Sequence, residues 1–269
     1  MKTLIFVGAS HTAAVKAYAN EISNELDGFS VYAFPIKYAF DGRGIFSKTN
    51  GRWNFSEPFL DFLNIQSEKS ELFLFSMFGG NAHNVFGFLE PETRFDFLLP
   101  ALPDESLSEK AVFLPYDVVE AAIREIADGH LSQIWLLKHL VEKAGAAASN
   151  CIWHIESPPP HDDPSVARIL EAEAATEEEP GLAAAARGKR ITEERIRLKL
   201  WHTNSTVFRA RCELEGIGFI EAPSAASDGA GFLKPEFQGD DVVHAGTRYG
   251  RLVVAQAIQV ASKKQGFRL

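Results

Sequence analysis

The feature that most constrains how this 269-residue chain can fold is the alternation of short apolar runs with segments of helical periodicity. Apolar runs typical of strands buried on both faces lie at residues 3–7, 29–34, 72–78, 151–155 and 216–220. Between and after them, apolar residues recur every three to four positions, which predicts helices at residues 12–26, 57–65, 117–145, 166–175, 191–214 and 247–262. Such alternation predicts a parallel sheet with helices on both faces.

We therefore predict the α/β class: a three-layer α/β/α sandwich with a flavodoxin-like parallel sheet of about five strands in the order 2-1-3-4-5. Right-handed crossovers limit the alternatives to a few topologies. In this order the first and third strands are neighbours at the topological switch point, where ligands bind beyond the carboxyl ends of the strands. Polar residues that directly follow these two strands are therefore expected to face one crevice.

Length and composition fit a single domain over residues 1–269. A hydrophobic content of 46% allows a sizeable core. Residues 37–57, rich in Gly, Asn and Ser, predict a loop. We expect residues 83–115 to form an irregular connection that is rich in aromatic residues. We expect residues 161–199 to form a cap or a mobile segment.

Charge and cysteine content narrow the classes of partner. The net charge of −9 disfavours nucleic acid, and no apolar stretch is long enough to span a bilayer. The two cysteines, Cys151 and Cys212, lie in no metal-binding pattern, so we expect neither a disulfide scaffold, nor a metal, nor a cofactor.

The first apolar run breaks at His11, too early for a signal peptide, and a cytoplasmic location is expected. Only Gly8 follows the first strand, without the glycine pattern of a dinucleotide site.

Three polar motifs could supply the parts of one catalytic site. Ser10 follows the first strand, Asn81 follows the third, and Asp241-Val242-Val243-His244 precedes the last helix. A serine hydroxyl is a poor nucleophile at neutral pH and needs a neighbouring base, for which His244 is the candidate. Asp241 could orient the imidazole and stabilise its protonated form. Asp240 competes for this role, although the D-x-x-H spacing favours Asp241.

Attack by a serine on a carbonyl creates an oxyanion that needs preorganised hydrogen-bond donors. The backbone N–H of Ser10 and the side-chain amide of Asn81 are two candidates. A glycine N–H from the loop at residues 42–51 would complete the oxyanion hole, with Gly44 preferred and Gly42 in reserve.

The three motifs together resemble those of the SGNH, or GDSL-type, hydrolase superfamily. Gly8-Ala9-Ser10 matches the frame of its first block, Gly79-Gly80-Asn81-Ala82 matches G-x-N-D at the glycine and asparagine, and Asp241 to His244 matches D-x-x-H. Ala9 and Ala82 replace aspartates that are usual in the family, which marks a divergent member. The resemblance implies a serine hydrolase that cleaves an ester through an acyl-enzyme, without metal or cofactor. By analogy with the family, the substrate is a small-molecule or carbohydrate ester with a short acyl group.

Two other functions stay open on the same fold: an O-acyltransferase that moves an acyl group to a sugar hydroxyl, and a non-catalytic domain that binds a carbohydrate or a partner. Each motif also has a structural interpretation, as a helix N-cap for Ser10, a turn residue for Asn81 and a surface pair for Asp241 and His244. Flanking histidines are weaker candidates for substrate binding and are more often ordinary loop residues; they are His11, His83 and His161.

Overall fold

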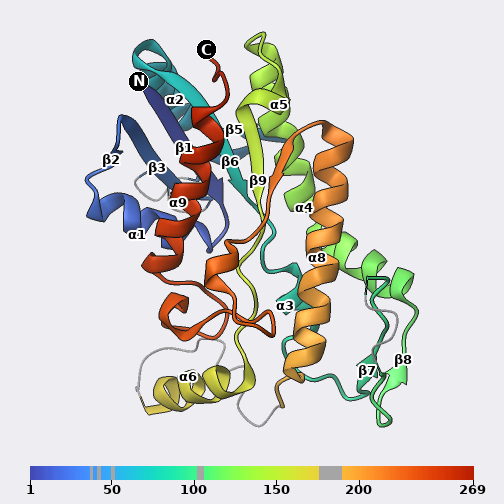
Figure 1. Cartoon of the computed structure of the whole chain (residues 1–269). Coiled ribbons are helices and arrows are strands. Elements are labelled where there is room, and N and C mark those ends of the chain that lie inside the picture. Colours follow the sequence, from blue (N-terminus) through green and yellow to red (C-terminus); the bar gives the residue numbers. More distant parts are fainter. Residues whose placement is uncertain (37–38, 41–43, 50–51, 102–105, 176–189) are drawn as a thin grey trace.

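A six-stranded sheet in the order β10-β9-β6-β1-β3-β2 lies at the centre of the computed structural model, which describes residues 1–36, 39–40, 44–49, 52–101, 106–175 and 190–269 (Figure 1). Its five parallel strands are β1 (Lys2–Gly8), β3 (Phe29–Pro35), β6 (Glu71–Met77), β9 (Ile152–Ile155) and β10 (Gly218–Ile220). Numbered along the chain, these five strands run 2-1-3-4-5, as predicted. The short strand β2 (Glu25–Leu26) adds an antiparallel edge beside β3.

Helices cover both faces of the sheet, which confirms the α/β class (Figure 1). On one face α1 (Thr12–Glu21) packs against α9 (Thr247–Ser262). On the other face α4 (Tyr116–Lys143) packs against α8 (Glu194–Glu215) and α3 (Ala82–Gly87). The remaining helical elements are α2 (Glu57–Lys69), α5 (Ala148–Cys151), α6 (Asp163–Ala175), η1 (Ser224–Ala226) and η2 (Pro235–Phe237).

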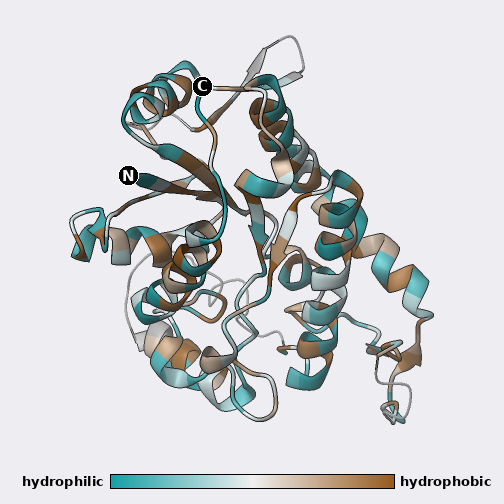
Figure 2. Cartoon of the chain, turned by 45° about the horizontal axis from the view of Figure 1, so that its top comes forward, coloured by the Kyte–Doolittle hydropathy of each residue, from teal (hydrophilic) through white to brown (hydrophobic). Residues whose placement is uncertain are grey.

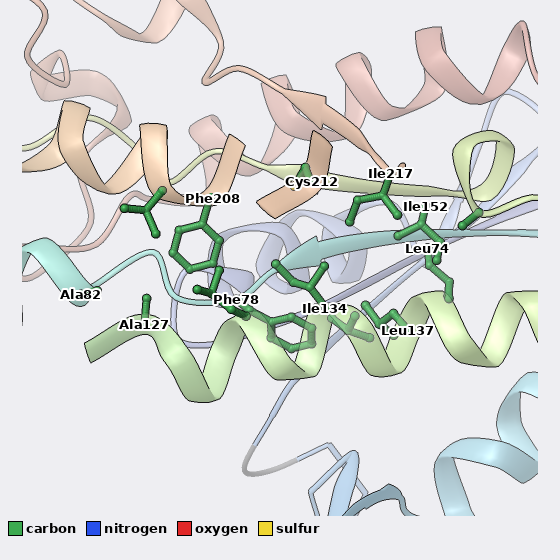
Figure 3. Packing of buried hydrophobic residues seen from close by; sticks show 14 of the residues in the cluster. Leu74, Phe78, Ala82, Ala127, Ile134, Leu137, Ile152, Phe208, Cys212 and Ile217 are labelled. Atoms are coloured by element: carbon green, nitrogen blue, oxygen red, sulfur yellow. The ribbon is translucent and has the colours of Figure 1, made fainter. Parts of the chain in front are cut away.

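The period of two along the central strands divides the core between the two faces. Leu4 and Phe6 of β1 join the cluster beneath α1 and α9, whereas Ile5 and Val7 join the cluster beneath α4 and α8. Figure 3 shows side chains of α8 and α4 meeting those of Leu74 and Ile152 from the sheet. Figure 2 shows hydrophobic residues along the central strands and hydrophilic ones on much of the helical surface. Because both faces are covered, the strands are apolar almost throughout.

The predicted loop over residues 37–57 is wrong for its second half. Phe46–Thr49 (β4) and Arg52–Phe55 (β5) pair as an antiparallel hairpin, with Phe46 opposite Phe55 and Thr49 opposite Arg52. Asn50-Gly51 between them in the sequence is a strong hairpin signal that the loop prediction overlooked. Two residues of this hairpin, Phe46 and Trp53, line a cavity.

Other element boundaries also differ from prediction. The first helix ends at Glu21 rather than at residue 26, since Ser23 and Asn24 adopt positive φ values of 52° and 62° that turn the chain into β2. The connection over residues 83–115 contains α3 and a two-stranded sheet of β7 (Phe95–Asp96) and β8 (Val112–Phe113). Within the predicted cap at 161–199, α6 and the start of α8 are ordered helix, and residues 176–189 lie outside the described residues. No helix in the described part of the chain has the length and apolarity of a membrane span.

Candidate active site

Asp241 and His244 form a tight hydrogen-bonded unit in the loop before α9. Asp241 Oδ1 accepts the backbone N–H groups of Val243 and His244, both at 2.9 Å, and Oδ2 accepts His244 Nδ1–H at 2.5 Å. The loop is closed by hydrogen bonds from Gly239 N–H to His244 O and from Gly246 N–H to Phe237 O, both at 2.8 Å. Asp240 is exposed, and the imidazole is held by Asp241. The orientation of His244 is therefore fixed by local geometry.

The ionisation of Asp241 suits the role of an orienting carboxylate. Burial disfavours the charged form, but the hydrogen bond and the charge of His244, together with the two backbone N–H groups, outweigh it and lower the pKa of Asp241 to about 2. Since the carboxylate accepts a hydrogen bond from Nδ1–H, the free lone pair of a neutral His244 is on Nε2. This Nε2 atom is buried and has no hydrogen-bond partner among the described residues. His244 thus presents an unused proton acceptor.

Ser10 lies at the carboxyl end of β1, in the turn that leads into α1. His11 occupies the N-cap position of α1, so Ser10 is not the cap that the structural interpretation required. The Ser10 side chain is exposed, and its backbone N–H donates no hydrogen bond within the described residues. The ring of the next residue, His11, lies 5.1 Å from the ring of His244, centroid to centroid. The chain therefore brings the segment that carries Ser10 to His244 through His11, and within the described residues Ser10 Oγ makes no hydrogen bond to Nε2.

Asn81 follows β6, the neighbour of β1, and stands at the N-cap of α3 without making a side-chain capping bond. Its Oδ1 accepts a hydrogen bond of 2.7 Å from Asn84 Nδ2. This bond assigns the orientation of the amide and leaves the Nδ2 donors of Asn81 available to a ligand. Asn84 was not predicted from sequence. The signal that could have found it is the spacing of three residues, which puts two amides on one helix face.

Ser10, Asn81 and Gly44 line one cavity of about 780 Å³. The structure thus brings together the three residues predicted to supply the oxyanion hole. A Cβ atom at Gly44 would collide with the carbonyl oxygen of Ile36, so only glycine allows this close backbone approach. Gly42, the reserve candidate, lies outside the described residues.

The three flanking histidines are buried rather than lining this cavity. Their exposed fractions are 3% for His11, 3% for His83 and 1% for His161. His11 Nε2–H donates to Gly80 O and His161 Nε2–H donates to His244 O, both at 3.3 Å. The predicted contacts of these histidines with substrate remain predictions.

Desolvation is the main cause of the low basicity of these buried rings. It lowers the pKa of His11 to about 3, assisted by the nearby His244, and the pKa of His83 to about 3, assisted by His11. Burial also lowers the pKa of His161 to about 4. All three imidazoles are therefore neutral near pH 7, and the ionised group beside His244 is Asp241.

The cavity is also lined by residues of the hairpin and of α4 that were not predicted from sequence. Phe46 and Trp53 come from β4 and β5, and Ile126, His130 and Gln133 come from α4. The hairpin could have been found from Asn50-Gly51, but helical periodicity alone does not tell which turn of α4 reaches the site. Among the described residues, no group of three His, Cys, Asp or Glu side chains is arranged to hold a metal ion.

Comparisons with known proteins give structural likenesses only. No protein-family model and no curated protein matches the chain. The chain is similar to the solved structure of a carbohydrate acetylesterase family member from Sinorhizobium meliloti, with 14% identity over 97% of this chain and 100% of that one and a TM-score of 0.43. It is also similar to the aryl esterase of M. smegmatis, with 13% identity over 97% and 99% of the two chains and a TM-score of 0.42.

A GDSL-like lipase from Bacteroides thetaiotaomicron VPI-5482 is a further similar structure, with 12% identity over 97% of this chain and 88% of that one and a TM-score of 0.40. The sequence motifs resemble those of the same family.

Proposed function

We propose that this protein is a serine hydrolase that cleaves a carboxylic ester through an acyl-enzyme. The observation that carries the proposal is the His244 imidazole, held through Nδ1–H by Asp241, with Nε2 unpartnered beside the segment that carries Ser10. A base in the required tautomer next to an exposed serine is the arrangement that activates a hydroxyl nucleophile.

In the first half of the reaction, Ser10 Oγ attacks the acyl carbonyl while His244 Nε2 accepts the hydroxyl proton. Asp241 stabilises the imidazolium that forms, and its lowered pKa keeps it ionised throughout. The developing oxyanion is stabilised by the Ser10 N–H, the Asn81 Nδ2 donors and the Gly44 N–H. Collapse of the intermediate expels the alcohol, which takes the proton from His244 Nε2.

In the second half, His244 removes a proton from water, and the resulting hydroxide attacks the Ser10 ester. A second tetrahedral intermediate then collapses to the free acid, and His244 returns the proton to Ser10 Oγ. These steps need no metal or cofactor. A sugar hydroxyl in place of water would turn the same acyl-enzyme into an acyltransferase, so the two functions differ only in the acceptor.

A test by kinetics compares the hydrolysis of p-nitrophenyl acetate and hexanoate by the parent protein, Ser10→Ala and His244→Ala. Loss of the nucleophile or the base is expected to lower kcat by about 10⁴-fold or more. Ser132→Ala and His139→Ala, both at exposed positions on α4, are matched controls that should keep the parent rate. Equal rates for all five proteins would overturn the catalytic roles of Ser10 and His244.

A second test does not depend on the acyl group. A fluorophosphonate should phosphonylate Ser10 Oγ with release of fluoride, giving one adduct that mass spectrometry locates on the peptide containing Ser10. His244→Ala should slow this labelling because the base is missing. Hydrolysis in the presence of added sugars, followed by product analysis, then separates water from a sugar hydroxyl as the acceptor.

A further inference from the structure

The cavity that Ser10, Gly44 and Asn81 line is walled mainly by apolar side chains. They come from the end of β3, the β4–β5 hairpin, α3 and α4, and are Pro35, Ile36, Phe46, Trp53, Val85 and Ile126. None of the described lining residues is Asp, Glu, Lys or Arg. The two polar residues on α4, His130 and Gln133, are hydrogen-bonded to each other at 3.1 Å. This wall is therefore suited to an uncharged, apolar group.

Three of the wall residues are exposed large hydrophobic side chains. The exposed fractions are 43% for Trp53, 69% for Val85 and 37% for Ile126. Single exposed apolar residues are common on proteins, but here three of them surround one hollow. Covering this surface with an apolar ligand group would remove it from water at a gain in binding free energy.

The position of the catalytic groups decides which part of an ester enters the cavity. The reacting carbon carries three substituents besides Ser10 Oγ: the oxyanion, the leaving alcohol and the acyl chain. The oxyanion must face Asn81 and Gly44, and the leaving oxygen must face His244 Nε2, which protonates it. Among the described residues that line the cavity, neither Asp241 nor His244 is present. The acyl chain is the substituent that remains for this space.

We infer that the cavity is an acyl-binding pocket selective for uncharged, apolar acyl groups longer than acetyl, an inference that rests on the proposed esterase function. A cavity of about 780 Å³ lies in the range of about 300–1,000 Å³ that ligand sites span, far more than an acetyl methyl group fills. This inference differs from the short acyl group expected by family analogy and favours a longer chain.

The inference is tested with p-nitrophenyl acetate, butyrate and hexanoate. Each methylene group that is buried should raise kcat/KM by up to about fourfold, so hexanoate should exceed acetate by one to two orders of magnitude. Ile126→Asp places a carboxylate in the pocket wall and should lower the hexanoate-to-acetate ratio of kcat/KM at least tenfold. Val118→Asp is the matched control, because Val118 is exposed on the same helix and does not line the cavity.

The outcomes separate this inference from the proposed function. If no ester is cleaved in a Ser10-dependent way and the fluorophosphonate does not label Ser10, the esterase function itself fails. If Ser10-dependent hydrolysis is seen but falls from acetate to hexanoate, only the acyl pocket is overturned. A preference for acetylated glucose over hexanoate esters would assign the cavity to a sugar and also overturn it. So would equal ratios for Ile126→Asp and Val118→Asp, with both proteins shown to be folded by thermal unfolding.

Discussion

The predicted site residues fall into two groups with sharply different surroundings, named here the open side and the closed side. The open side comprises Ser10, Gly44 and Asn81, which line one cavity. The closed side comprises His11, His83 and His161, which are almost fully buried and neutral near pH 7. The polar groups of the open side are thus available to a ligand, whereas those of the closed side are shielded from water.

In the proposed mechanism, the burial of the closed-side histidines affects the charge that surrounds His244. An imidazolium that forms on His244 would be repelled by other cations nearby, and desolvation keeps the three closed-side imidazoles uncharged. The counter-charge is supplied by Asp241, whose pKa is lowered to about 2. We therefore expect changes on the closed side to act mainly on stability, and changes on the open side mainly on rate.

The largest expected effect is a loss of stability at mildly acid pH. The pKa is lowered from 6.5 to about 3 for His11, His83 and the core residue His154, and to about 4 for His161. As the pH falls below 6.5, the unfolded chain takes up protons that the folded protein does not. Each histidine then lowers the free energy of unfolding by up to about 1.4 kcal/mol per pH unit, and the four together lower it by up to about 5.5 kcal/mol per pH unit.

Urea unfolding at pH 7, 6 and 5 measures this dependence. Asp241 acts in a lower window, because its stabilisation is present above about pH 4 and is lost as the pH falls through about 2. The prediction for the histidines therefore concerns pH 4 to 6.5 alone. A free energy of unfolding that stays constant from pH 7 to pH 5 would show that these rings are not held neutral.

The open side is tested by Asn81→Ala, with an expected loss of kcat of about 10²–10³-fold from removal of one oxyanion donor. The Asn81 side chain makes no capping bond to α3, and the substitution removes only its hydrogen bond with Asn84, so the free energy of unfolding should fall by no more than about 0.5–1.5 kcal/mol. Kinetics with p-nitrophenyl hexanoate and urea unfolding measure the two effects. A rate within threefold of the parent would exclude Asn81 as an oxyanion donor.

Packing on the closed side is tested by Gly80→Ala. A Cβ atom at Gly80 would lie 2.5 Å from His11 Cδ2 and 3.0 Å from Ser157 Cβ, so the buried ring must move. We expect a destabilisation of about 1–3 kcal/mol from overpacking. Gly129→Ala on α4 is the control, since its Cβ would meet nothing within 4 Å and should stabilise the helix by up to about 1 kcal/mol. Similar effects at both positions would contradict the tight packing behind His244.

The smallest expected effect is that of Asn84→Ala, which removes the hydrogen bond that orients the Asn81 amide. We expect kcat to fall by about tenfold, because a donor that must be oriented in each turnover stabilises the oxyanion less well. A double-mutant cycle separates orientation from a general structural effect. In the Asn81→Ala background, Asn84→Ala should have no further effect on kcat, and an undiminished loss there would refute the positioning role.

Sequence patterns predicted the strands of the central sheet better than they predicted the helix ends and the β4–β5 hairpin. The apolar runs located all five parallel strands, and the rule for α/β units gave their order, because a strand buried on both faces carries its signature in consecutive residues. Helix ends and the β4–β5 hairpin were less well predicted. Positive φ values at Ser23 and Asn24 end the first helix against its apolar periodicity, and such values are poorly encoded by hydrophobic pattern.

The candidate site likewise has one part that could be predicted from sequence and one part that could not. The Asp241–His244 unit could be predicted because its hydrogen bonds join residues three positions apart, within one short loop. The contact of His11 with His244 depends on how distant elements pack, and so does the cavity that the β4–β5 hairpin and Ile126 of α4 line together. By itself the sequence determined the strands, their order and the local D-x-x-H geometry. Tertiary structure alone decided which of the predicted site residues line the cavity and which are buried, because burial is a collective result of helices packing on a sheet and no single segment encodes it.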